Sequence, residues 1–258
     1  MKFRFSALAL FLLTAAGALA LDPARMLTQY SHRTWGIEQG LAQPTIYSIS
    51  QTHNGYLWLG TQDSLIRFDG IRFRAMDEVL GSPFDHRLVH AVLEDGRGNL
   101  WIGTVGSGLI RLAADGSVTP FGKARGMPSE NITCLASDSR GALWVCTEEG
   151  LVRRDNEHVR VFTTADGMPG NHPDSFCAAA DGTDWVAFSG YGLYRLEADR
   201  AKLFAPALPS NLKTVRALSC ARDGSVWAGT ENGLVRIRDG ATTLFTTTNG
   251  LADNWISA

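Results

Sequence analysis

A short stretch, Leu57-Trp58-Leu59-Gly60-Thr61, recurs through the chain with small changes. Its tryptophan is followed by four more, at successive spacings of 43, 43, 41 and 42 residues. The matching stretches are Trp101-Ile102-Gly103-Thr104, Trp144-Val145-Cys146-Thr147, Trp185-Val186-Ala187-Phe188 and Trp227-Ala228-Gly229-Thr230. This period is too long for a leucine-rich repeat and is typical of one blade of a β-propeller. The spacing therefore predicts an all-β chain, a β-propeller of four-stranded antiparallel blades.

Turn residues separate the strands expected within each repeat. In the first repeat, an inner strand near Ile46 to Gln51 precedes Asn54-Gly55, a pair that favours the positive φ of a hairpin turn. Asp69-Gly70 marks a later turn before the outer strand. Three successive hairpins make a four-stranded meander, which is one blade. We expect repeats at about residues 40–75, 76–123, 124–164, 165–206 and 207–247.

The two ends of the chain carry parts of further repeats. Residues 29–35 match the last strand of a repeat that has nothing before it. Residues 250–256 resemble the start of the third repeat and begin another unit at 250. Ring closure removes exposed strand edges, and one terminus often supplies the outer strand of a blade made by the other. The sequence predicts five full blades plus the start of a sixth, an incomplete ring of a seven-bladed propeller that continues beyond Ala258.

The repeated residues have structural roles. Large aromatic rings dominate packing, so each tryptophan is expected to fill space between neighbouring blades. A small residue two positions later allows close approach of the next sheet. The structural repeat residues are Trp58, Trp101, Trp144, Trp185, Trp227, Gly60, Gly103 and Gly229.

One charged residue also recurs, an arginine after each second turn. A ring of arginines would suit ligand contacts around an axis. We favour a structural role, in which each arginine pairs with a turn carboxylate or packs its stem along the blade. The five are Arg67, Arg111, Arg153, Arg195 and Arg236.

The loops that vary between repeats are the expected places for ligand contacts, since binding residues concentrate on loops held by a rigid scaffold. The fourth repeat carries an unusual segment, residues 169–174, before its inner strand and Ser189-Gly190-Tyr191 in its second turn. We take His172, Asp174 and Tyr191 as candidate ligand-binding residues. Each can equally be a loop residue without a ligand.

The N-terminus has the features of an export signal. Lys2 and Arg4 precede an apolar run, and Ala18-Leu19-Ala20 offers a small-x-small cleavage site. We expect a signal peptide at residues 1–20 and a partial propeller at 21–258. The alternative is an uncleaved membrane anchor, for which the uncharged run is barely long enough.

The cysteines and the overall charge give two further expectations. Cys134, Cys146, Cys177 and Cys220 show no metal-like spacing and are interpreted as small buried residues. If one bridge forms, Cys134–Cys146 is the best candidate, because the two face each other across one hairpin. A net charge of −2 gives no electrostatic reason to expect nucleic acid as a partner.

Catalytic signatures are missing from the sequence. It contains no GxSxG, HExxH or P-loop pattern, so we expect no enzyme in this segment, no metal and no cofactor. Propeller enzymes whose catalytic residues converge from several blades leave little linear signature. A secreted propeller enzyme such as a lyase therefore stays an alternative, as does a protein-interaction propeller.

The repeat resembles the two-component regulator propeller repeat, on the pattern Gly-Leu, Leu-Trp-x-Gly-Thr and Gly-Leu-x-Arg. Residues 40–67, 88–111 and 126–153 carry it best, and the resemblance covers about residues 29 to 258. Ala187-Phe188 in place of Gly-Thr and Ser64 in place of glycine are the departures.

The resemblance implies a periplasmic ligand-sensing region of an inner-membrane signalling protein. In that family, seven-bladed propellers precede a β-sandwich domain, a transmembrane helix and a cytoplasmic histidine kinase or diguanylate cyclase. The expected partners are an unknown small solute or oligosaccharide, the downstream domains of the same chain, and a second copy in a homodimer of the full-length protein.

Overall fold

The computed structural model describes residues 33–77, 87–156, 158–197, 200–204 and 214–257. The expected signal peptide and most of the expected closing strand at 29–35 lie outside these residues, and residues 33–35 form no strand. Residues 1–35 and 36–258 make separate units, and every strand below belongs to the second.

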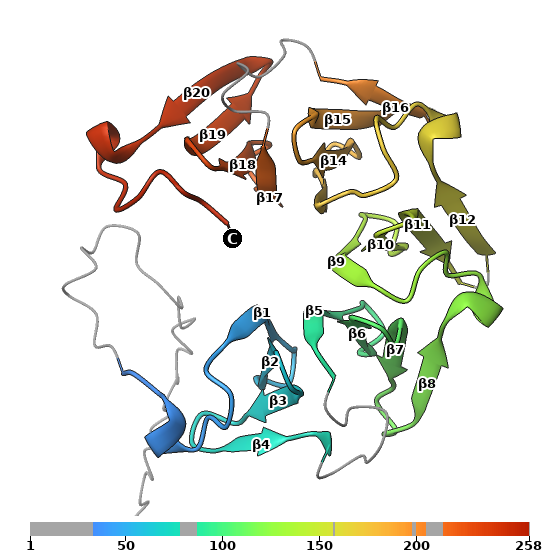
Figure 1. Ribbon diagram of the computed structural model, residues 1–258, viewed down its shortest axis with the longest axis vertical. Helices are drawn as coiled ribbons and strands as arrows, with labels where there is room; N and C mark the ends of the chain where they lie inside the picture. Colours follow the sequence, from blue (N-terminus) through green and yellow to red (C-terminus); the bar gives the residue numbers. More distant parts are fainter. Residues whose placement is uncertain (1–32, 78–86, 157, 198–199, 205–213, 258) are drawn as a thin grey trace, which may run out of the picture. The chain divides into compact units, whose positions relative to one another are not determined.

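The strands form five four-stranded antiparallel sheets, each pairing its strands in chain order, as the repeat predicts (Figure 1). The inner strands are β1 (Ile46–Gln51), β5 (Val89–Glu94), β9 (Ile132–Ser137), β13 (Ser175–Ala178) and β17 (Val215–Cys220). The second strands are β2 (Leu57–Thr61), β6 (Leu100–Thr104), β10 (Leu143–Thr147), β14 (Asp184–Phe188) and β18 (Val226–Thr230). The third strands are β3 (Leu65–Phe68), β7 (Leu109–Leu112), β11 (Gly150–Asp155), β15 (Gly192–Glu197) and β19 (Gly233–Arg238). The outer strands are β4 (Phe73–Ala75), β8 (Val118–Phe121), β12 (His158–Phe162), β16 (Arg200–Leu203) and β20 (Ala241–Phe245).

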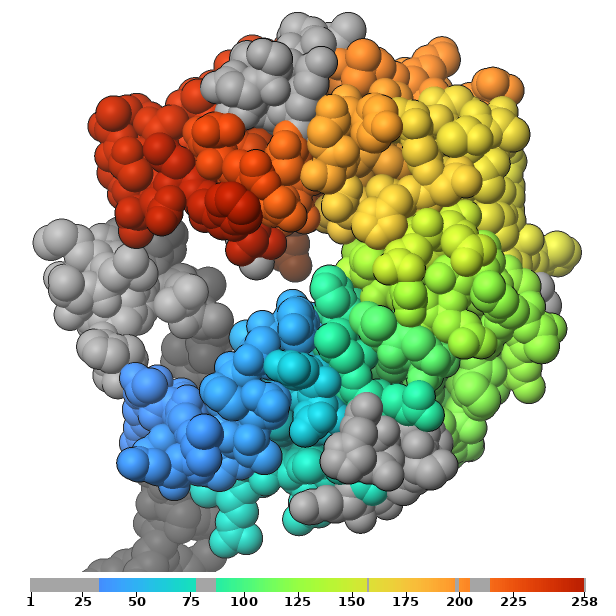
Figure 2. Space-filling model, viewed as in Figure 1, coloured from blue at the N-terminus to red at the C-terminus, as the bar shows by residue number. Residues whose placement is uncertain are grey.

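Each sheet is one blade, numbered 1 to 5 along the chain. Successive inner strands lie side by side, from β1 through β5, β9 and β13 to β17 (Figure 1). The atoms of blades 2, 3 and 4 meet without a break in the space-filling view (Figure 2). Within the part of the chain that the structure describes, no helix has the length and apolar character needed to cross a membrane.

The hydrophobic core lies between successive blades. At the junction of blades 2 and 3, for example, Trp101 and Leu109 of one blade cluster with Ile132 and Val145 of the next. Equivalent clusters fill the other three junctions between blades 1 and 5. The rings of Trp58, Trp101, Trp144 and Trp185 are at least 93% buried, since none exposes more than 7% of its surface. Burial of these large apolar surfaces joins the blades into one unit.

Glycine at the repeat's small position permits close contact with the following blade. A Cβ on Gly103 would lie 2.5 Å from Cγ2 of Ile132, the first residue of the next inner strand. A Cβ on Gly60 would likewise lie 2.7 Å from the carbonyl oxygen of Val89. Both distances are far below van der Waals contact, so a larger residue would force the blades apart.

A second glycine role appears where one blade leads into the next. Short 3-10 turns precede Gly126 and Gly167, which both have φ of +87° and end those turns in the left-handed conformation. Residues with a side chain adopt this conformation at a cost. Gly126-Met127 and Gly167-Met168 therefore mark the crossing from an outer strand to the next inner strand.

Past the fifth blade, the chain begins to repeat the same packing. The Ile256 amide donates to the Thr230 carbonyl at 2.9 Å. A Cβ on Gly229 would lie 2.8 Å from Cγ2 of Ile256. Ile256 thus takes the place that Ile132 takes against Gly103. Residues 251–257 contain the start of a sixth unit, as expected, although they do not form a strand.

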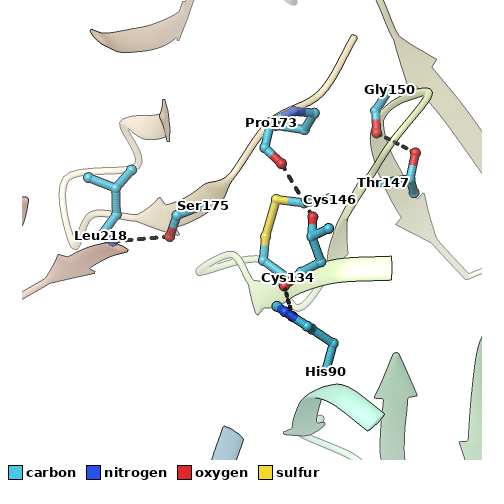
Figure 3. The surroundings of a disulfide bond; sticks show 9 residues. His90, Cys134, Cys146, Thr147, Gly150, Pro173, Ser175 and Leu218 are labelled. Atoms are coloured by element: carbon cyan, nitrogen blue, oxygen red, sulfur yellow. Dashed lines mark hydrogen bonds between the residues drawn. A yellow bond between two sulfur atoms is a disulfide. The ribbon is translucent and has the colours of Figure 1, made fainter. Parts of the chain in front are cut away.

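The cysteines form two disulfide bonds, so they are more than the small buried residues of our first interpretation. Cys134–Cys146 joins paired positions of β9 and β10 within blade 3, as the hairpin argument proposed (Figure 3). Cys177–Cys220 joins β13 to β17 and thus links blade 4 to blade 5. The sequence argument missed this second bond because it compared cysteines within one repeat. Their separation of 43 residues is about one full period.

Polar contacts also connect the inner strands of neighbouring blades. In Figure 3, a ring nitrogen of His90 on β5 lies 2.9 Å from the Thr133 carbonyl on β9. The Thr133 hydroxyl donates to the Pro173 carbonyl at 3.3 Å, and the Leu218 amide donates to Ser175 Oγ at 3.0 Å. Hydrogen bonds and apolar contacts therefore both act across the blade junctions.

Candidate functional site

The three predicted ligand residues lie around the start of blade 4. Asp174 holds the second turn of that blade, because its carboxylate accepts a 2.5 Å hydrogen bond from the Ser189 amide. Tyr191 lies in the same turn with 56% of its side chain exposed. His172 is also exposed. The structure thus links Asp174 to the turn of Tyr191, while a ligand role for all three residues stays a prediction.

The recurring arginines lie on the third strands and face the tryptophan of their own blade. Each arginine is paired across the hairpin with that tryptophan. The guanidinium carbons lie 4.3 to 6.0 Å from the tryptophan rings, in the range of cation–π contacts. Arg153 and Arg236 also form ion pairs with the turn carboxylates of Asp138 and Asp223. This arrangement supports the structural role rather than a ring of ligand contacts.

Two cavities lie at junctions between blades, and the sequence analysis predicted neither. The larger has a volume of about 360 Å³ and lies between blades 2 and 3. The smaller has a volume of about 270 Å³ and lies between blades 3 and 4. We call them the 2–3 cavity and the 3–4 cavity. Both are lined by the turn between inner and second strands, by the repeat tryptophan and by the third strands, and Arg140 lines both.

The 2–3 cavity is rich in arginine. Among the described residues that line it are four arginines and two aspartates: Arg97, Arg111, Arg140, Arg154, Asp95 and Asp155. Arg154 is the most enclosed of the four, with 9% of its surface exposed, and its guanidinium lies 4.4 Å from the centre of the Phe121 ring. This arginine comes from blade 3 and packs on an aromatic ring of blade 2.

Asp95, which lines this cavity, is engaged in hydrogen bonds within its own blade. Its carboxylate accepts hydrogen bonds from Asn99, from the Trp101 indole at 2.8 Å and from the Arg97 amide. Partial burial would raise the pKa of Asp95, but the hydrogen bonds from Asn99 and Trp101 outweigh it and hold that pKa below its usual value. The ionised Asp95 therefore fixes the turn and the tryptophan.

The 3–4 cavity has a different charge balance. The ionisable residues among its described lining are Asp138, Asp184, Arg140 and Arg153. Burial and the nearby Asp138 carboxylate raise the pKa of Asp184 to about 6, against the opposing effect of Arg153 and Arg140. The pKa of the Asp184 carboxyl thus lies well above its ordinary value.

One cross-strand pair accounts for much of the difference between the cavities. In blade 3 the pair is Leu143 with Arg154, and in blade 4 it is Asp184 with Leu196. The other three blades carry two apolar residues there, namely Leu57 with Phe68, Leu100 with Leu112, and Val226 with Ile237. Aligning the five repeats position by position reveals both charged residues. Both lie within strands, whereas the ligand candidates were taken from the loops that vary, and neither was therefore predicted.

The five blades define the chain as a β-propeller, and comparison with known proteins places its repeats. Residues 40–63, 83–106 and 126–149 match the two component regulator propeller family. The chain therefore carries the repeats of that family in blades 1 to 3. A search of curated protein sequences gives no match to the chain.

Solved structures share the fold at low sequence identity. One is the extracellular domain described as the hybrid two component system BT3049 from B. thetaiotaomicron, at 23% identity and a TM-score of 0.71. The match covers 82% of this chain and 31% of that one. A second, the extracellular domain of the one component system BT4673 from the same organism, matches at 20% identity and a TM-score of 0.63, over 79% of this chain and 30% of that one. The present chain thus spans about a third of the length of these domains.

An enzyme shares the fold as well. Virginiamycin B lyase from Staphylococcus aureus matches at 14% identity and a TM-score of 0.63, over 78% of this chain and 69% of that one. Because identities this low show the fold alone, function has to be argued from the repeats and the site.

Proposed function

We propose that this chain is the ligand-sensing propeller of an exported, membrane-bound signalling protein. The observation that carries the proposal is the match of blades 1 to 3 to the two component regulator propeller repeat, in register with the blades of the structure. The likeness to extracellular domains of two component and one component systems supports it. The ligand is a small solute or an oligosaccharide.

The mechanism we propose is a shift between two arrangements of the propeller and the domains that follow it. A ligand shifts such an equilibrium only as far as it binds one arrangement better than the other. Binding at a junction between blades would supply this difference, because a junction responds to small changes in blade packing. The output, a histidine kinase or a diguanylate cyclase, belongs to the full-length protein, for which we also propose a homodimer.

Sequencing the reading frame beyond Ala258 tests whether the full-length protein carries a signalling output domain. We expect further Trp-Gly-Thr repeats, a transmembrane helix and a kinase or cyclase domain. A stop codon after only one or two more blades would overturn the proposal.

A fusion to alkaline phosphatase tests export independently. Phosphatase fused after residue 258 is expected to be active in cells, since this enzyme matures only outside the cytoplasm. Deletion of residues 2–20 is expected to abolish that activity while leaving the amount of fusion protein detectable by immunoblot.

A propeller lyase is the second candidate, because virginiamycin B lyase shares the fold. Incubating the purified chain with virginiamycin B and following the amount of unchanged substrate by liquid chromatography distinguishes the two functions. The sensor proposal expects the substrate to stay unchanged, whereas its conversion by the purified chain would establish the enzyme.

A further inference from the structure

The 2–3 cavity has the size and the lining of a site for a small molecule. Ligand pockets in proteins typically measure about 300–1,000 Å³ and combine a hydrophobic or aromatic wall with a few convergent polar groups. The 2–3 cavity, at about 360 Å³, is within this range, whereas the 3–4 cavity, at about 270 Å³, falls below it. Trp101 supplies an aromatic wall, and Asn99, Ser137 and Asn156 supply polar groups.

The charge of the 2–3 cavity favours an anion. Its four arginines outnumber its two aspartates among the described lining residues, and the Asp95 carboxylate is already saturated by hydrogen bonds. A buried Nε without a hydrogen-bond partner among the described residues is shared by Arg111, Arg153 and Arg195, so it is a property of the repeat and not of this cavity. Guanidinium groups match carboxylate and sulfate oxygens in geometry and donate charge-assisted hydrogen bonds to them.

The position of Arg154 shows that this charge is not a property of the fold. Four blades place an apolar residue at the equivalent point of the third strand, namely Phe68, Leu112, Leu196 and Ile237. Burial of an arginine costs free energy that an apolar residue would avoid. Four blades thus form without an arginine at this point, and in blade 3 Arg154 packs on Trp101 and Phe121 of blade 2.

We infer that the 2–3 cavity binds a small organic anion, of the size of a single sugar acid. Its carboxylate accepts hydrogen bonds from Arg154, and the exposed Arg97 and Arg140 of the lining add positive charge. Its hydroxyl groups meet the polar groups of the wall and its ring lies against Trp101. The identification of this anion as the sensed ligand rests on the proposed function, whereas binding itself depends on this chain alone.

Isothermal titration calorimetry with three probes tests the assignment on the purified chain. Glucuronate and glucose differ in the carboxylate, and sulfate carries the negative charge without a sugar ring. We expect glucuronate to bind with one site per chain and more tightly than glucose by about tenfold or more, since hydrogen bonds to charged groups contribute that much. Equal binding of glucose, no binding of glucuronate, or binding of sulfate alone would overturn the inference.

Variants place the binding in the cavity. Arg154→Leu restores the apolar pair of the other blades and is expected to weaken glucuronate binding by about tenfold or more. Arg238→Leu removes one positive charge from the third strand of blade 5, outside both cavities, and is expected to bind as the parent does. Circular dichroism melting of both variants checks that they fold.

Two results separate this inference from the proposed function. If Arg154→Leu folds and binds glucuronate as tightly as the parent chain, the cavity is not the site. If glucuronate does not bind but the reading frame leads to a kinase or cyclase, the sensor proposal stands and the ligand assignment fails.

Discussion

The 2–3 cavity and the 3–4 cavity occupy the same place in the repeat but differ in charge and size. Both are lined by a turn aspartate that accepts a hydrogen bond from the indole of the repeat tryptophan, Asp95 from Trp101 and Asp138 from Trp144. One difference is a cross-strand pair, which brings Arg154 into the first cavity and Asp184 into the second. Another lies in the turns, since Arg97 and Arg140 both line the 2–3 cavity and Gly182 takes part in lining the 3–4 cavity. A repeated scaffold thus keeps its fold and changes the chemistry of its cavities at a few positions.

The largest expected effect concerns what the two cavities share, the buried tryptophan. Trp144 is 2% exposed and stacks on Phe176 of the next blade at 4.6 Å. Trp144→Ala is expected to cost about 3–5 kcal/mol of unfolding free energy, as for other large-to-small core substitutions. Urea unfolding measures it. The matched control is Trp255→Ala, at a ring that is 54% exposed, for which we expect a loss below about 1 kcal/mol.

The next largest effect concerns the two disulfide bonds. Cys177–Cys220 crosses the junction of blades 4 and 5, whereas Cys134–Cys146 lies within blade 3. Replacing both Cys177 and Cys220 with alanine is expected to cost about 2–4 kcal/mol. The same change at Cys134 and Cys146 is expected to cost about 1 kcal/mol less, because that bond closes a shorter loop, with a separation of 12 rather than 43 residues. Unfolding midpoints of the two double variants give the order, and the reverse order would contradict the loop argument.

A smaller expected effect is a pH dependence of the unfolding free energy that comes from Asp184 in the 3–4 cavity. Because the folded state raises the pKa of Asp184 from 3.8 to about 6, it holds this proton to higher pH than the unfolded state does. The stability from this group is fully present below about pH 4 and is lost as the pH rises through 6. Solvent screening of this partly exposed group limits the loss to about 1–2 kcal/mol.

Asp184→Asn is expected to remove that part of the profile. Urea unfolding at pH values from 4 to 8 measures the difference between parent and variant, so that the contributions of other carboxyls cancel. A constant difference over this range would show that Asp184 does not titrate as described.

The smallest expected effect is the change in unfolding free energy when Arg154 of the 2–3 cavity is replaced. Arg154→Leu restores the apolar pair found in blades 1, 2 and 5 and is expected to leave the unfolding free energy unchanged or raise it by up to about 1 kcal/mol. Thermal melting of Arg154→Leu, with Arg238→Leu as the reference variant, measures this change in stability. A loss above about 2 kcal/mol would mean that the blade junction depends on the arginine.

The sequence predicted the blades and the packing between them, because the residues that form both recur in each repeat. Trp101 and Gly103 recur in kind at fixed spacing, and both turned out to lie at blade junctions, where ring packing and close approach require them. The structural role of Arg153 followed from the same recurrence.

The cavities were not predicted, because they depend on residues that differ between repeats. Arg154 and Asp184 are single charges within apolar strands, and the strand pairing shows that they belong to the same cross-strand pair of their two blades. The link between Cys177 and Cys220 was missed for a related reason, since it joins two blades whose relative placement a single repeat does not define. Loop candidates such as His172 are chosen by their variation alone, and no contact of a ligand supports them.

The measurement that tests the central claim most directly transfers the charged pair between blades. Leu143→Asp combined with Arg154→Leu gives blade 3 the Asp–Leu pair of blade 4, while the rest of the lining of the 2–3 cavity stays as it is. Calorimetric titration with glucuronate then compares this variant with the parent chain. If the cross-strand pair decides what the cavity binds, the parent takes up one glucuronate molecule and the doubly substituted chain takes up none. A folded variant that still binds glucuronate as the parent does would contradict the account.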